Sequence, residues 1–104
     1  MINYSLLVWN KVKQQNISWS DDKLETILEF PNGVVIEGKS YEKLKIETIK
    51  DEDKYLSRFY NPNGIGWKQI KERGARRDNM CEVHADALAG LRGLYVRQHL
   101  KDFK

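Results

Sequence analysis

The sequence predicts an α+β fold in a single domain over residues 1–104, with an antiparallel sheet of about three strands packed against helices and a long carboxyl-terminal helix. Two hydrophobic periodicities and the length of the chain predict this fold class. Between residues 23 and 49, apolar and polar residues alternate, which is the period of a half-buried strand. After residue 79, apolar residues recur at three- and four-residue steps, which is the period of an amphipathic helix. A chain of this length can bury one modest core and not two.

The amino-terminal residues predict a short first helix, because Tyr4, Leu7 and Val8 recur at helical steps. Their apolar patch ends at Lys11, which is too short to span a bilayer, and it lacks the basic region and cleavage site of a signal peptide. The lone Cys81 has no partner for an internal disulfide, as is usual in a reducing compartment. These features predict a cytoplasmic protein without membrane contact.

The strongest local signal is a β-hairpin. Residues 24–30 alternate apolar and polar side chains, and residues 34–37 return as the partner strand. Between them, Pro31-Asn32-Gly33 predicts a tight turn, because glycine readily adopts the left-handed conformation that closes a short loop. The alternative is a helix capped by Ser20 over the same residues. We prefer the strand because a β-rich run follows the turn.

The middle of the chain predicts a third strand and two short helices. A turn at residues 38–40 leads into the strand, at residues 43–49. Asp51-Glu52-Asp53 supplies acids suited to a helix amino terminus, and aromatic and apolar residues follow it over residues 55–60. A second short helix is expected over residues 67–74, ending at a glycine in the usual cap position.

The last segment predicts the longest helix. Asn79, with Glu82 three residues later, fits a capping box, and the helix runs from there toward Phe103. Apolar residues lie on two sides of it: Met80, Val83, Ala87, Leu91 and Leu94 on one, and Ala85, Ala89, Val96 and Leu100 on the other. Such a helix is expected to pack on both sides, against the sheet and against the smaller helices or a second copy of the chain. Val96, Leu100 and Phe103 are therefore candidates for an apolar interface, in a homodimer or with a hydrophobic partner.

Charge is distributed unevenly along the chain. Residues 1–53 hold seven Lys and ten Asp or Glu, a net charge of −3, whereas residues 54–104 hold eleven Lys or Arg and five acids, a net charge of +6. All six arginines lie in the second half, and guanidinium groups suit phosphate and carboxylate. The candidate binding residues are Trp67, Lys68, Lys71, Arg73, Arg76 and Arg77.

Two functions fit this basic segment. It surrounds a predicted helix-turn-helix junction, which would place cations near phosphates, so we expect a small non-enzymatic regulatory module that contacts nucleic acid or a nucleoprotein. The alternative is a protein-binding inhibitor or adaptor whose basic residues meet an acidic surface of its target. A third interpretation, which implies no function, is that the segment is a solvated basic loop with local ion pairs.

Catalytic and metal chemistry have little support. Cys81 and His84 are neighbours on the predicted helix, but His99 is too far along it to complete a zinc site, so His84 is expected to be a core residue. Glu82 and Asp86 form a carboxylate pair typical of a solvated stripe. Hydrolysis at Glu82, His84 or Asp86 is a distant third hypothesis. The bare Gly-x-Gly at residues 64–66 predicts a turn rather than a phosphate loop, and no cofactor, metal or catalytic residue is expected.

Overall fold

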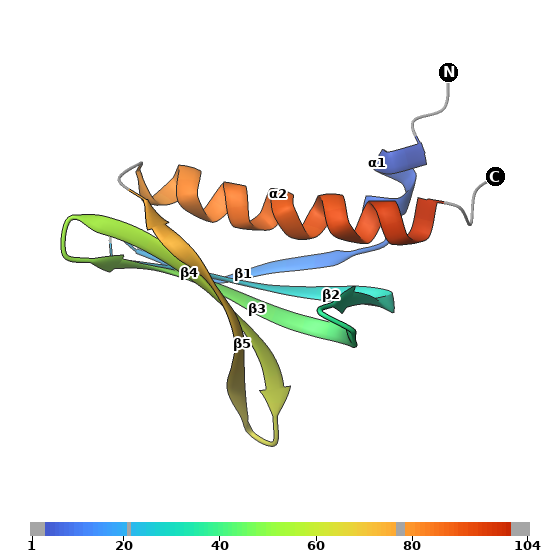
Figure 1. The fold of residues 1–104 in the computed structure, drawn as a ribbon, viewed down its shortest axis with the longest axis horizontal. Coiled ribbons are helices and arrows are strands. Elements are labelled where there is room, and N and C mark those ends of the chain that lie inside the picture. The colour runs from blue at the N-terminus through green and yellow to red at the C-terminus, as the bar shows by residue number, and fades with distance from the viewer. Residues whose placement is uncertain (1–3, 21, 77–78, 101–104) are drawn as a thin grey trace.

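The computed structural model describes residues 4–20, 22–76 and 79–100. It is a five-stranded antiparallel sheet in the order β1-β2-β3-β4-β5, with a long helix along one face (Figure 1). This confirms the α+β class and the carboxyl-terminal helix, but the predicted sheet of about three strands was too small. In chain order the elements are α1 (Tyr4–Trp9), β1 (Lys13–Trp19), β2 (Lys23–Ile36), β3 (Lys39–Asp51), β4 (Lys54–Asn63), β5 (Gly66–Arg76) and α2 (Met80–His99).

β2 does not turn at Pro31-Asn32-Gly33, so the predicted position of the hairpin was wrong. The strand continues to Ile36, and residues 30–33 lie opposite Glu42 alone, as a bulge in the ladder with β3. Asn32 and Gly33 adopt φ values of 64° and 77° within this bulge. The positive φ that the glycine predicted is present, but it bends a strand instead of closing a hairpin.

Side chains of α2 explain why the strand continues. β1 pairs with β2 only as far as Glu29, so the next part of β2 has no neighbouring strand on that side. The Tyr95 hydroxyl donates to the Pro31 carbonyl at 2.8 Å, and the Gln98 amide bonds both the N–H and the carbonyl of Val35 at 2.8 Å. The helix thus supplies the hydrogen bonds that a further strand would supply.

The turns that join β2 to β3, β3 to β4 and β4 to β5 lie elsewhere, and each contains a residue with positive φ. Glu37 and Gly38, with φ of 51° and 85°, form a two-residue turn between the paired residues Ile36 and Lys39. Glu52, with φ of 58°, lies in the β3–β4 turn, so the acidic run there does not begin a helix. Gly64, with φ of 63°, lies in the β4–β5 turn, which confirms that the Gly-x-Gly segment is a turn.

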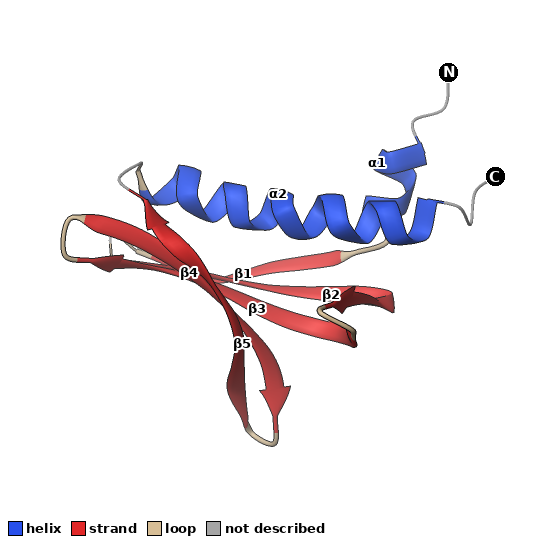
Figure 2. Cartoon of the chain, in the orientation of Figure 1, coloured by secondary structure: helices blue, strands red, loops and turns tan. Residues whose placement is uncertain are grey.

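The segments expected to form two short helices are the strands β4 and β5 (Figure 2). Phe59 and Ser57 are buried on the α2 side of β4, while Arg58 and Tyr60 lie on the opposite face. The apolar spacing in residues 55–60 fits both periods over so short a run, and the aromatic residues favour a strand once the neighbouring β3 is available to pair.

The core lies between the sheet and α2. Ala87, Leu91, Tyr95 and Val96 of α2 pack against the buried residues of β2, β3 and β4, which include Leu28, Phe30, Leu44, Ile46 and Phe59. Tyr95 also makes ring contacts with Phe30, at 5.3 Å between centroids, and with Trp9, the last residue of α1, at 6.5 Å.

The start of α2 was predicted correctly. Asn79 is the N-cap, and its side-chain oxygen accepts a hydrogen bond from the Glu82 N–H at 2.9 Å. The helix ends at His99, and Leu100 is its C-cap.

Two of the three residues predicted to form an apolar interface on α2 pack within the chain. Val96 is buried within the chain and Leu100 packs against the core, so neither presents the exposed apolar surface that was expected. Phe103 lies outside the described residues. Ala85 and Ala89 are exposed on the outer side of the helix. Self-association of the chain stays a prediction.

Candidate binding groove

The sheet divides into two arms at the ladder pair Lys45↔Tyr60, where pairing between β3 and β4 stops. Past this point, β3 stays paired with β2 as far as Lys39, whereas β4 stays paired with β5 as far as Asn63. Figure 1 shows the β4–β5 hairpin pointing away from the tip of the β2–β3 hairpin. Two adjoining hollows lie between the arms, an inner one that α2 also lines and an outer one, and together they are here called the fork groove.

The inner half of the fork groove is apolar. It is a cavity of about 250 Å³ between α2 and the two arms. Its apolar and small residues are Ile36, Phe59, Ala87, Gly90, Leu91 and Leu94, and the cations Lys71 and Arg73 complete the lining. An apolar cavity with cations beside it favours a ligand that has both an apolar and an anionic part.

The outer half is more polar and adjoins the inner half at Ile36. It is a hollow of about 360 Å³ between the tip of the β2–β3 hairpin and the β4–β5 hairpin, lined by Ile36, Glu37, Lys39, Tyr41, Asn61, Lys68, Gln69 and Ile70. Within the part of the chain that the structure describes, Lys39 and Lys68 make no ion pair with a carboxylate. Their charges are therefore available to an anionic partner.

A single ion pair crosses the fork in the described structure. The Lys71 ammonium lies 3.7 Å from a Glu37 carboxylate oxygen, and the two side chains are 43% and 72% exposed. Ion pairs this exposed contribute about 0–1 kcal/mol, so a partner carboxylate can compete with Glu37 for Lys71 at little cost.

Arg73 joins β5 to the helix. Its Nη1 donates to the main-chain carbonyl of Asp86 at 2.7 Å. Gly90, one turn along α2, gives the guanidinium room, because a Cβ at this position would lie 3.1 Å from Arg73 Nη1. Arg73 therefore links β5 to α2 at the wall of the inner cavity, and one of its N–H donors is already used in this bond.

A bulge in β5 brings the cations to one side of the strand. Side chains alternate along a regular strand, so Lys68 and Lys71 would lie on opposite faces. The register of β5 against β4 shifts between the pairs Lys71↔Phe59 and Gln69↔Tyr60. This irregularity places Lys68 on the same side as Lys71 and Arg73, facing the fork groove.

The remaining predicted binding residues are Trp67, Arg76 and Arg77. Trp67 is half-buried on the face of the sheet away from α2, where Lys45 Nζ lies 5.0 Å from its ring centroid. Arg76 ends β5, but its side chain and the whole of Arg77 lie outside the described residues. The helix-turn-helix interpretation was wrong, because the residues expected to form its first helix belong to β5.

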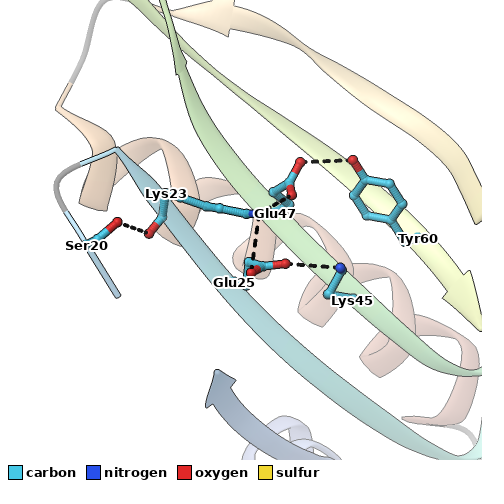
Figure 3. Close-up of polar contacts among 6 residues, drawn as sticks. All are labelled: Ser20, Lys23, Glu25, Lys45, Glu47 and Tyr60. Atoms are coloured by element: carbon cyan, nitrogen blue, oxygen red, sulfur yellow. Dashed lines mark hydrogen bonds and ion pairs between the residues drawn. The ribbon is translucent and has the colours of Figure 1, made fainter. Parts of the chain in front are cut away.

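The sheet face away from α2 holds a network of paired charges (Figure 3). Lys23 Nζ lies 3.6 Å from Glu25 and 3.3 Å from Glu47, and Lys45 Nζ lies 3.0 Å from the other Glu25 oxygen. The Tyr60 hydroxyl donates to the second Glu47 oxygen at 2.9 Å. Every carboxylate oxygen of the two glutamates thus has a partner, and this network has no unused charge to attract a ligand.

The same network raises the pKa values of two of its groups. Hydrogen bonding to Glu47, followed by the charge of Glu25, raises the pKa of Lys23 above its usual value. Burial raises the pKa of the Tyr60 phenol, and the hydrogen bond to Glu47 raises it further. Both groups therefore keep their protons at neutral pH, which suits a structural role.

His84 is a buried core residue, as predicted. It belongs to a chain of hydrogen bonds that crosses the interior from β1 to β4 through Asn16, Thr26, His84, Thr48 and Ser57. The Thr26 hydroxyl donates to Asn16 Oδ1 at 2.9 Å, so its oxygen accepts from His84 Nε2–H at 2.8 Å. Nδ1 then accepts from the Thr48 hydroxyl at 2.7 Å, and Thr48 accepts from Ser57 at 2.8 Å.

This arrangement needs a neutral imidazole with its proton on Nε2. Burial lowers the pKa of His84 from 6.5 to about 4, so the ring is neutral at physiological pH. Both ring nitrogens are occupied by structural hydrogen bonds. The ring is therefore a connector between the sheet and α2.

The other chemical candidates do not assemble into a site. Cys81 and Glu82 are exposed on α2, and Asp86 is half-exposed, with its main-chain carbonyl bonded to Arg73. Among residues 4–20, 22–76 and 79–100, no group of three or more His, Cys, Asp or Glu side chains is placed to hold a metal ion. No helix in the described part of the chain is long and apolar enough to cross a membrane.

Comparison of the chain with models of protein families, with curated proteins and with solved structures found no match in any of the three.

Proposed function

We propose that the protein is a non-enzymatic binding module that holds an acidic part of another protein in the fork groove. The observation that carries this proposal is the position of Lys68, Lys71 and Arg73 on one side of β5, where Lys71 and Arg73 line an apolar cavity and Lys68 lines the hollow that adjoins it. Cations next to an apolar surface are typical of protein interfaces, where charge sets orientation and rate and apolar contact supplies affinity.

Nucleic acid fits this groove less well. A two-stranded ribbon can enter a groove of DNA as a helix can, but the cations Lys68, Lys71 and Arg73 of β5 line the fork groove, between the two arms of the sheet. The positive charge is interrupted by Glu37 beside Lys71 and by Glu72, which lies 2.9 Å from Arg58. The apolar cavity also contributes nothing to phosphate binding.

Affinity capture from lysate tests the proposal. The wild-type chain is immobilised, lysate is passed over it with and without nuclease, and bound proteins are identified and purified. We expect a protein that is retained after nuclease treatment and rebinds in purified form. Retention that disappears with nuclease would contradict the proposal and favour nucleic acid.

A charge-reversal variant links the captured protein to the groove. Changing Lys39, Lys68 and Lys71 to Glu should remove binding without unfolding the chain, because all three side chains are exposed. Arg73 is left unchanged, because it bonds the Asp86 carbonyl and its loss would perturb the helix. Equal capture by this variant would show that the partner binds elsewhere.

A further inference from the structure

We propose that the occupant of the fork groove is an extended acidic peptide segment, which pairs with the free edge of β3 and inserts one apolar side chain into the cavity beside Gly90. This inference rests on the proposed function and specifies the form of the partner.

β3 has a free edge beside the fork groove. β3 pairs with β2 along one side down to Lys39, but its pairing with β4 stops at Lys45. The backbone groups of residues 39–44 on the β4 side therefore have no partner strand among the described residues. An unpaired edge of this kind is a template for strand addition, in which main-chain hydrogen bonds supply affinity.

The cavity has the size of one side chain. Pockets that hold whole small molecules span about 300–1,000 Å³, and the inner half of the fork groove, at about 250 Å³, is smaller. It is lined by Ile36, Phe59, Leu91 and Leu94, all apolar, and Gly90 borders it beside the Arg73 guanidinium. These dimensions fit a single apolar side chain carried by a larger partner.

Both arms carry positive charge beside the fork groove. Lys39 lies at the β2–β3 tip and Lys68 on the β4–β5 hairpin, so a segment between the arms passes both ammonium groups. Side chains of an added strand alternate between its faces, so residues flanking the apolar anchor can place carboxylates near these cations. The segment should therefore carry one apolar or aromatic anchor with acidic residues around it.

Two glycines of α2 provide a matched pair of variants. A Cβ at Gly90 would lie 3.1 Å from Arg73 Nη1 and beside the cavity, whereas a Cβ at Gly93 would meet nothing within 4 Å. Both positions are exposed and helical. Gly90→Glu and Gly93→Glu therefore make the same change in charge and in helix propensity, but only the first displaces the Arg73 guanidinium, obstructs the fork groove and repels acidic residues.

The experiment uses a phage library of random linear peptides, selected on the full-length protein. We expect the enriched peptides to share acidic residues around one apolar anchor. The best binder is synthesised together with a version whose anchor is glycine, and both are titrated by fluorescence anisotropy. Loss of the anchor should weaken binding by about tenfold or more, and Gly90→Glu should do the same, while Gly93→Glu should stay within about twofold of wild type.

Amide chemical shifts locate the peptide. Binding in the fork groove should shift the amides of residues 39–44, Gly90 and Leu94, and leave those of β1 unchanged. Peptides without acidic residues, shifts elsewhere, or full affinity for Gly90→Glu would overturn the inference. If no peptide is enriched while the captured protein still depends on Lys39, Lys68 and Lys71, the inference fails and the proposed function stands.

Discussion

Acidification should destabilise the fold through His84. The folded chain holds this imidazole neutral with a pKa of about 4, compared with 6.5 for an unperturbed histidine. Below pH 6.5 the unfolded chain binds a proton that the folded chain does not accept until about pH 4, so the free energy of unfolding falls over this interval. A difference of about 2.5 pH units corresponds to about 3 kcal/mol, at about 1.4 kcal/mol per unit. The effect is absent above pH 6.5.

Urea denaturation at a series of pH values measures this loss. His84→Gln should lower stability at neutral pH by about 1–3 kcal/mol, because the hydrogen bonds to Thr26 and Thr48 lose their geometry. Its stability should fall less between pH 6.5 and pH 4 than that of the wild type. Asn79→Ala is the control, because it removes a helix cap and no titrating group, and this variant should keep the wild-type slope.

The titration of the His84 ring gives a second measurement that needs no variant. Its ring proton signals in the folded protein should stay unchanged until the pH approaches 4. A His84 signal that titrates near pH 6.5, or equal slopes for the wild type and His84→Gln, would refute the account of the buried chain.

Three further predictions concern stability in urea. Gly33→Val should cost about 1 kcal/mol or more, because a β-branched residue resists a φ of 77°. Val35→Thr, at an exposed position of the same strand, is the control and should be nearly neutral. Asn79→Ala should cost about 1 kcal/mol by removing the cap of α2, and Asn79→Ser should restore most of it. Glu47→Gln should cost about 1 kcal/mol through its bonds to Lys23 and Tyr60, and no loss would show that the network is dispensable.

Local signals in the sequence predicted those parts of the fold that depend on local contacts. The cap at Asn79 and the alternation in residues 24–30 are set by neighbours within a few positions, and both are present. The course of β2 beyond Phe30 could not be predicted in this way. It depends on hydrogen bonds from Tyr95 and Gln98, which are more than sixty residues away in the sequence.

The same limit applies to β4 and β5. Residues 55–60 and 67–74 carry apolar spacings that suit a helix over one or two turns, and only pairing with β3 and with each other decides for strands. A short segment that fits both periods takes the structure that its neighbours in the fold favour. Those neighbours lie outside any sequence window of a few residues.

The candidate site was predicted in part. The charge asymmetry pointed to Lys68, Lys71 and Arg73, and these residues do line one groove. Lys39 was missed, because it lies in the acidic half of the chain and reaches the groove only through the β2–β3 hairpin. A glycine within a helix leaves room for a close neighbour, and in the structure the neighbour of Gly90 is the Arg73 guanidinium.

The central claim is that cations of the fork groove bind an acidic protein partner. The most direct measurement compares two triple variants for affinity to the captured partner by titration calorimetry. One changes the groove residues Lys39, Lys68 and Lys71 to Glu, and the other changes three exposed lysines outside the fork groove, Lys13, Lys50 and Lys54, to Glu. Both change the net charge equally, so a general charge effect would weaken them alike. We predict that the groove variant loses at least about tenfold in affinity while the other stays within about threefold of wild type, and equal losses would contradict the claim.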